Sequence, residues 1–226
     1  MRSLILIVFL SVLTSGSSHL PNGIYTKCYD PGTISLTFDD GMSERSLQIA
    51  AILEEKQIKA TFFVIGNTLV KNTNFLSLKQ IYERGHQIAS HSWTHPYLTK
   101  LSDKRFEYEI LETQNGLGLI DHDWKRYIRP PFGAINQTIY DKLTKFGYFV
   151  VLWNIDLRDW NIHRTESQIL TSYNKIMDKA NPSKDSFILI LHERQRTVTV
   201  LPKIIDIGKA KGFRFITVDN CITLNH

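Results

Sequence analysis

The sequence has few of the features that would place it outside the ordinary globular proteins. Its 226 residues include only two cysteines, no internal repeat and no linker rich in glycine, serine or proline. These absences exclude a disulfide-dense miniprotein and a repeat array, and they favour a single domain. No cluster of lysine and arginine stands out although the net charge is +5, so we expect no nucleic-acid partner. Apolar content of 42% and charged content of 22% are typical of a globular chain.

Long hydrophobic runs are also scarce, and the one that matters lies at the start of the chain. Leu4 to Leu13 is apolar or small, follows Arg2 and precedes small polar residues, which is the three-part form of a secretory signal. We therefore expect a signal peptide at 1–17 and one functional domain over 18–226, secreted or associated with the cell wall. An uncleaved anchor reaching residue 20 is the alternative. No later run is long enough to span a bilayer, so we expect no stable membrane insertion after signal removal.

The two cysteines, Cys28 and Cys221, lie before the first and after the last of the strands expected below. In an oxidising compartment an even pair favours a disulfide, which would join the two ends of the fold. Two free buried thiols are the alternative.

Short apolar runs alternate with amphipathic stretches, and this pattern predicts an α/β fold with a mainly parallel sheet, closed or nearly closed, and helices outside. Strands are expected at 33–38, 59–65, 86–90, 126–129, 147–154, 186–192 and 213–218. Helices are expected at 43–57, 75–84, 103–121, 136–146, 164–180 and 199–211. Pro202 falls near the start of the last helix, where proline is tolerated. Seven strands would leave a barrel one short of the usual eight.

Polar side chains follow successive expected strands. They are Asp39 and Asp40, His91, Arg129, Asp156 and His192. Because the carboxyl ends of parallel strands meet at one mouth of a barrel, we expect these side chains to lie together there.

The acids and histidines of this set have the spacing of a metal site. The adjacent carboxylates of Asp39 and Asp40 are hard to hold charged without a cation or a shared proton, although a turn and helix start is the plainer interpretation. His91 and His95 are four residues apart, and two histidines with one carboxylate leave positions open for water and substrate. The same ligands describe non-haem iron sites. Here the carboxylate lies 51 residues before His91, which argues against iron.

Three further segments add charged and aromatic groups. Arg129 precedes two prolines, so a rigid turn would hold its guanidinium, which can bind a carboxylate. The segment from Asp156 to Trp160 supplies two acids and an indole that could stack on a sugar or fill the core. A buried strand at 187–191 ends at His192.

Taken in order, these five motifs resemble those of the polysaccharide deacetylases of the carbohydrate esterase 4 group, the NodB-homology family that includes chitin deacetylases. The resemblance implies a distorted (β/α) barrel of about seven parallel strands. It implies Asp39 as general base and Arg129 as the residue that orients it. The implied metal ligands are Asp40, His91 and His95. The implied general acid is His192, paired with Asp159.

The resemblance also extends to the substrate site. It implies that the backbone N–H of Phe132 faces the oxyanion and that Trp160 forms part of the groove wall. Ile190 and Leu191 would belong to the substrate site, with Ile190 at the acetyl-methyl pocket. The chain departs from the family where Phe132 replaces a common tyrosine, Ile190 a common leucine and Glu193 a frequent aspartate. None of these changes removes a catalytic group.

The function implied by the resemblance is removal of N-acetyl groups from polymers or oligosaccharides of N-acetylglucosamine, with a divalent metal, zinc or alternatively cobalt. Chitin and peptidoglycan are both candidate substrates. Acetyl-xylan would be the O-ester version of the same attack, and a non-catalytic wall-binding protein with the same fold is the competing hypothesis. Asn136 begins a glycosylation sequon. The sequence makes no prediction of oligomeric state.

Overall fold

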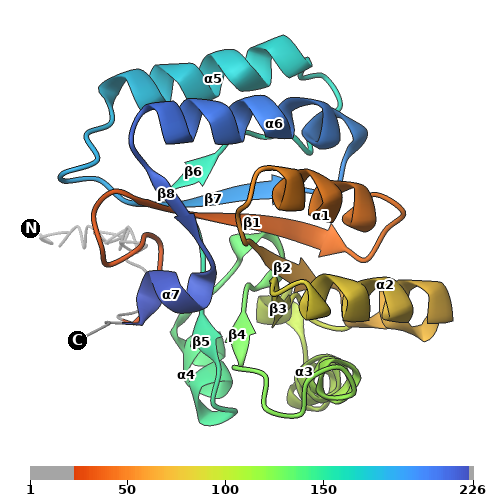
Figure 1. Cartoon of the computed structure of the whole chain (residues 1–226). Coiled ribbons are helices and arrows are strands. Elements are labelled where there is room, and N and C mark those ends of the chain that lie inside the picture. Colours follow the sequence, from red (N-terminus) through yellow and green to blue (C-terminus); the bar gives the residue numbers. More distant parts are fainter. Residues whose placement is uncertain (1–22, 224–226) are drawn as a thin grey trace, which may run out of the picture.

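The computed structural model describes residues 23–223, so the signal peptide expected at 1–17 and the first residues of the domain expected at 18–226 lie outside the described residues (Figure 1). Within 23–223, no helix combines the length and the apolar character needed to cross a membrane. The strands are β1 (Thr33–Gly41), β2 (Thr61–Val64), β3 (Gln87–Ser90), β4 (Tyr127–Ile128), β5 (Phe149–Val150), β6 (Ile155–Asp156), β7 (Phe187–His192) and β8 (Arg214–Ile216). The helices are α1 (Ser46–Glu55), α2 (Asn72–Glu83), α3 (Asp103–Gly118), α4 (Gln137–Lys145), α5 (Glu166–Lys179), α6 (Gln195–Ala210) and α7 (Val218–Ile222).

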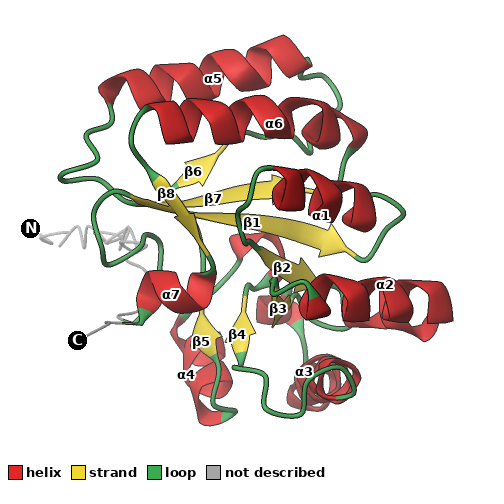
Figure 2. Ribbon diagram, in the orientation of Figure 1, coloured by secondary structure: helices red, strands yellow, loops and turns green. Residues whose placement is uncertain are grey.

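All strand pairs in the described residues are parallel, in the order β5-β4-β3-β2-β1-β7-β6, and β8 pairs with the beginning of β1. Helices cover the outside of this curled sheet, with α5 and α6 packed together over β6 and β7 (Figure 2). Within residues 23–223, β5 and β6 do not pair, so the barrel stays open on that side. The expected α/β fold with a distorted barrel is confirmed.

The strand expected at 147–154 is instead reduced to the two residues of β5, and β6 begins just after it on the opposite edge of the sheet. β5 pairs with β4 and β6 pairs with β7, and the chain between them crosses the open side. The carbonyl groups of Val151 and Leu152 accept hydrogen bonds from the Arg129 side chain, so they serve a buried cation rather than a neighbouring strand.

The last long helix also differs from the expectation. It begins at Gln195 rather than residue 199, so Pro202 lies inside α6 and not near its start. Proline in a helix interior removes one backbone hydrogen bond. The buried apolar face of α6, which includes Val200, Leu201 and Ile204, packs on the core and offsets that loss. The short helix α7 was not expected from the sequence.

Side chains of β1 and β7 alternate between two layers, and this alternation positions the site. Ile34, Leu36 and Phe38 of β1 belong to the core between sheet and helices. Residues that alternate with them, Thr37 and Asp39, are buried and polar, and both bond Arg129 on the inner side of the sheet. The inner side therefore carries the polar groups, as expected for alternating positions of a strand.

A second, smaller cluster fills the barrel interior near the chain ends, and a disulfide between Cys28 and Cys221 lies in it. Both cysteines are 2% exposed or less. The bridge expected from the sequence is therefore present, and it links the segment before β1 to α7 across a sequence separation of 193 residues.

Candidate active site

The polar residues expected from the sequence come together around a cavity of about 580 Å³ at the carboxyl ends of the strands. Its lining residues are Asp39, Asp40, His91, His95, Phe132, Gly133, Trp153, Asp156, Trp160, Ile190, His192 and Arg194. Arg129 and Asp159 lie behind this lining, fully buried, and each bonds a residue that reaches the cavity. One expected substrate residue is elsewhere: Leu191 points to the outer face of β7 and is part of the core, because it alternates with Ile190 and His192.

Two consecutive carboxylates reach the same cavity because the strand that carries them is irregular. Strict alternation would send Asp39 and Asp40 to opposite faces of β1. The register of β1 against β2 shifts between Phe38 and Gly41, and Asp40 has a left-handed backbone with φ of 69°. Such a bulge re-aims a side chain. Both Asp39 and Asp40 consequently line the cavity.

Asp40, His91 and His95 offer ligand atoms that all lie within 4.8 Å of one another. The Nε2 atoms of the two histidines are 3.1 Å apart, and those of His91 and His95 lie 3.7 and 3.4 Å from Asp40 Oδ1. His91 Nδ1 is 2.7 Å from the carbonyl oxygen of Arg129. That carbonyl can only accept, so Nδ1 carries the proton and Nε2 presents a lone pair to the cavity. Burial lowers the pKa of His91 to about 3, with His95 adding to the effect, which keeps this imidazole neutral. Two imidazole nitrogens and one carboxylate oxygen fit a divalent metal with open coordination positions.

Asp39 lies beside these ligand atoms and is hydrogen-bonded to a buried arginine, Arg129. Arg129 Nη1 donates to Asp39 Oδ1 at 2.6 Å and to Thr37 Oγ1 at 2.9 Å. The guanidinium packs 4.1 Å from the centre of the Phe63 ring. Burial raises the pKa of Asp39, and the charge of Arg129 opposes that rise. The carboxylate is thus fixed in direction, with Oδ2 left toward His91 at 3.7 Å.

His192 faces Asp39 from the neighbouring strand, since the two residues are partners in the β1–β7 pairing. Its Nδ1 lies 2.8 Å from Asp159 Oδ1, and its backbone N–H donates to Asp159 Oδ2 at 2.7 Å. Thr197 Oγ1 donates to the same oxygen. Burial alone would lower the pKa of His192, but the hydrogen bond and charge of Asp159 outweigh it and the pKa is raised. Asp159 therefore favours the protonated form of His192.

Aromatic side chains form part of the cavity rim. Phe132 stacks on Tyr97 with ring centres 4.1 Å apart and meets His95 edge-on at 4.5 Å. Phe132 also has a left-handed backbone, with φ of 61°. Trp160 is 47% exposed, whereas tryptophan side chains are on average highly buried. The rim thus presents flat apolar faces beside the charged centre.

A family model of polysaccharide deacetylases matches residues 26–151, which is more than half of the chain. The chain belongs to the polysaccharide deacetylase family. The peptidoglycan-N-acetylglucosamine deacetylase of Listeria monocytogenes is 33% identical over 192 residues, which cover 82% of this chain but only 38% of that protein. The chain therefore spans well under half of this relative.

Solved structures of this family share the fold. The chitin deacetylase of Colletotrichum lindemuthianum has a TM-score of 0.81 at 27% identity, covering 90% of this chain and 93% of its own. A family pseudoenzyme from Bacillus anthracis has a TM-score of 0.78 at 21% identity, covering 90% of this chain and 70% of its own. At that identity the likeness shows the fold alone. Because a pseudoenzyme shares it, the activity of this polysaccharide deacetylase homologue has to be argued from the site.

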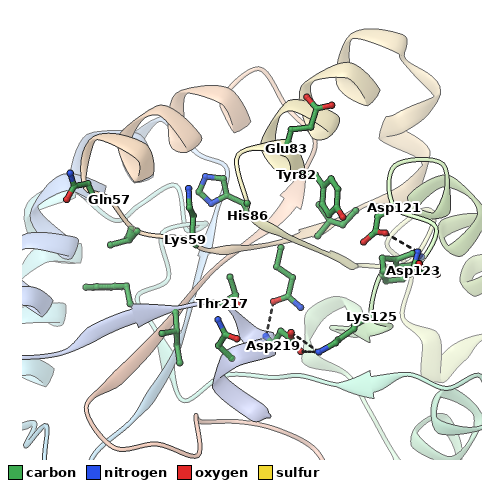
Figure 3. Close-up of a pocket in the computed structure, with 18 residues that line it drawn as sticks. Gln57, Lys59, Tyr82, Glu83, His86, Asp121, Asp123, Lys125, Thr217 and Asp219 are labelled. Atoms are coloured by element: carbon green, nitrogen blue, oxygen red, sulfur yellow. Dashed lines mark hydrogen bonds and ion pairs between the residues drawn. The ribbon is translucent and has the colours of Figure 1, made fainter. Parts of the chain in front are cut away.

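A larger cavity of about 750 Å³ lies where β2 and β3 begin, the opposite end from the carboxyl-terminal mouth of these strands (Figure 3). Lys125 pairs there with Asp219 at 2.7 Å, and Lys59 lies near His86 in Figure 3. Burial lowers the pKa of His86 to about 4, and nearby positive charge adds to this. None of the site residues expected from the sequence lines this cavity, so cavity size alone does not identify the candidate active site.

Three residues of the site region were not expected from the sequence. Arg194 donates to Asp40 Oδ2 at 3.2 Å, and Trp153 lines the cavity beside Gly133. Glu109 of α3 bonds the loop between the two histidines. Only Glu109 had a usable signal: it lies between Phe106 and Thr113 on the buried stripe of the helix, where a carboxylate needs a partner.

Proposed function

We propose that this chain is a metal-dependent hydrolase that removes N-acetyl groups from glycans containing N-acetylglucosamine. The observation that carries the proposal is the arrangement of one cavity. Three candidate ligand atoms lie in it beside two proton-transfer groups, Asp39 held by Arg129 and His192 held by Asp159. Amide hydrolysis needs a base for the attacking water and an acid for the departing amine.

The metal site is assigned to Asp40, His91 and His95. A divalent ion there, zinc by family resemblance and cobalt as the alternative, would supply Lewis acidity that lowers the pKa of water and polarises the acetyl carbonyl. His91 is oriented for this by its Nδ1–H bond to the Arg129 carbonyl. Arg194 neutralises part of the charge on the outer oxygen of Asp40.

Asp39 is assigned as the general base. Its Oδ1 accepts from Arg129, so Oδ2 is the oxygen available to take a proton from water. Burial raises the pKa of Asp39, which makes the carboxylate a stronger base than an exposed aspartate. As water adds to the acetyl carbon, its proton passes to Asp39 and the carbonyl oxygen becomes an oxyanion. The Phe132 backbone N–H is assigned as an oxyanion donor, on the family resemblance.

His192 is assigned as the general acid. Asp159 raises its pKa, which keeps the proton in place until the C–N bond breaks. His192 then protonates the leaving nitrogen, and the products are acetate and a free amino sugar.

Glycans containing N-acetylglucosamine are the proposed substrate class. Trp160 and the stacked pair of Phe132 and Tyr97 offer exposed faces on which sugar rings can pack. Ile190, which is apolar and lines the cavity, is assigned to the acetyl methyl group. The names of the Listeria and Colletotrichum relatives support both peptidoglycan and chitin as substrates to test.

We place this function outside the cytoplasm, in secreted or wall-associated form. Support comes from the Cys28–Cys221 disulfide, which oxidising compartments preserve, and from the signal-like pattern at 1–17. The mature domain would then be 18–226. Mass spectrometry of the exported protein tests the cleavage site.

Acetate release from a panel of chitin oligosaccharides, chitin, peptidoglycan and acetyl-xylan tests the proposal. The protein is loaded with zinc, and a parallel sample is treated with a chelator. We expect chelator-sensitive release from at least one N-acetylglucosamine polymer. Release only from acetyl-xylan would change the reaction to O-deacetylation. Metal binding without release from any substrate would favour a non-catalytic wall-binding protein.

A further inference from the structure

Glu109 is a fully buried carboxylate of α3 that has no role in the proposed mechanism. It is 0% exposed. Its Oε2 accepts the backbone N–H of Thr94 at 2.7 Å, and its Oε1 accepts the Thr94 hydroxyl at 2.6 Å. Arg105, one turn earlier on α3, donates to Oε1 at 2.7 Å. Two of the three bonds therefore go to a single residue, Thr94, which lies between the two candidate metal histidines.

The loop that carries Thr94 has an uncommon backbone. Ser92 and His95 both have left-handed conformations, with φ of 63° and 62°. Non-glycine residues adopt this region infrequently, and they keep it only where surrounding contacts hold the chain. Ser92 Oγ accepts the N–H of His95 at 3.1 Å. The bonds from Thr94 to Glu109 hold the adjoining peptide from the opposite side, the side of α3.

The two histidines are held in different ways. His91 directly follows β3, and its ring is fixed by the hydrogen bond from Nδ1 to the Arg129 carbonyl. His95 is the more exposed of the two, with 23% of its side chain accessible against 3% for His91. Its backbone N–H donates to Ser92 Oγ. The position of His95 thus depends on the path of the loop, which Glu109 holds at Thr94, as well as on the edge-on contact of its ring with Phe132.

We propose that Glu109 is a positioning residue for the metal site, acting through Thr94 to keep His95 Nε2 within reach of His91 Nε2 and Asp40. The inference rests on the proposed metal role of Asp40, His91 and His95. Contacts that orient a ligand from behind commonly change metal affinity by about 10- to 100-fold when removed. Glu109 and Thr94 form such a contact one residue away from the ligand itself.

Zinc affinity tests this inference without use of catalysis. Zinc binding is measured by competition with a chromophoric chelator for the full chain and for Glu109→Gln, Thr94→Val and Thr94→Ser. Glu107→Gln is the matched control, because Glu107 is an exposed carboxylate of the same helix. We expect Glu109→Gln and Thr94→Val to weaken zinc binding by roughly tenfold or more. Thr94→Ser keeps the hydroxyl, and it should bind zinc like the unaltered chain, as should Glu107→Gln.

The outcomes separate this inference from the proposed function. Thr94→Val keeps the shape of the side chain and the backbone donor, so it remains informative if Glu109→Gln folds poorly. Zinc binding that is unchanged in Thr94→Val and in folded Glu109→Gln would overturn the positioning role, even if both variants melt at lower temperature. Failure of the unaltered chain to bind zinc would instead overturn the proposed metal site, and the inference with it.

Discussion

Replacing Asp159 with asparagine should remove the proton from the proposed general acid while leaving the shape of the site intact. Asp159 Oδ2 accepts two donors, the His192 backbone N–H and the Thr197 hydroxyl, and Oδ1 meets His192 Nδ1 at 2.8 Å. An asparagine would keep its oxygen toward the two donors. Its amide N–H would then point at Nδ1, which has to act as acceptor, so the imidazolium form loses both its hydrogen bond and its counterion.

The size of the effect follows from that one contact. A hydrogen bond to a charged group contributes about 1.5–3 kcal/mol, which corresponds to a fall of roughly one to two units in the pKa of His192. Loss of general acid catalysis costs about 10²- to 10⁴-fold. We therefore expect kcat for acetate release to fall by roughly 100-fold or more, with little change in KM. The alkaline limb of the pH–rate profile should move to lower pH, because the acid is active only while protonated.

The assay is the initial rate of acetate release by zinc-loaded enzyme across the pH range, on the best substrate of the panel. Asp178→Asn, which alters an exposed carboxylate of α5, is the control. An alkaline limb at the same pH in Asp159→Asn, together with kcat within threefold or so of the unaltered enzyme, would refute the assignment of His192 as an acid supported by Asp159.

Two predictions concern stability. Burial holds the pKa of His86 at about 4, below its ordinary 6.5, so the unfolded chain takes up this proton first and stability should fall as pH drops through that window. The loss in the free energy of unfolding approaches roughly 3 kcal/mol. Urea unfolding at neutral and acid pH should show that this free energy depends less on pH in His86→Gln than in the unaltered chain. An equal pH dependence in the two proteins would contradict the reasoning. Replacing Cys28 and Cys221 together by serine should cost about 3–5 kcal/mol because the bridge closes a long loop. An unchanged urea midpoint would contradict this.

Much of the fold could be predicted from the sequence because two signals agreed. Apolar runs alternated with amphipathic stretches, and charged or titratable side chains, such as Asp39 and His192, followed the apolar runs. The prediction of secondary structure failed where contacts with distant parts of the chain determine the conformation of a short segment. Residues 147–154 have the sequence pattern of one strand, but their central carbonyl groups accept hydrogen bonds from the buried side chain of Arg129. The local sequence gives no sign of this contact.

The residues of the candidate site that belong to sequence motifs could be predicted, but the contacts that support these residues could not. The partners of Asp40 and His91 include Arg194 and the Arg129 carbonyl, which sit in other parts of the chain. Leu191 was misplaced because the motif does not say which face of a strand each residue takes. Strand alternation from His192 would have assigned it to the core.

The most direct measurement is acetate release by zinc-loaded Asp39→Asn beside the unaltered chain, with zinc binding and glycan binding recorded for both. Asparagine keeps the contact with Arg129 through its oxygen but cannot take a proton from water. The account predicts that release falls by roughly 100-fold or more while both binding properties persist. Release within a few-fold of the unaltered chain would contradict Asp39 as the base.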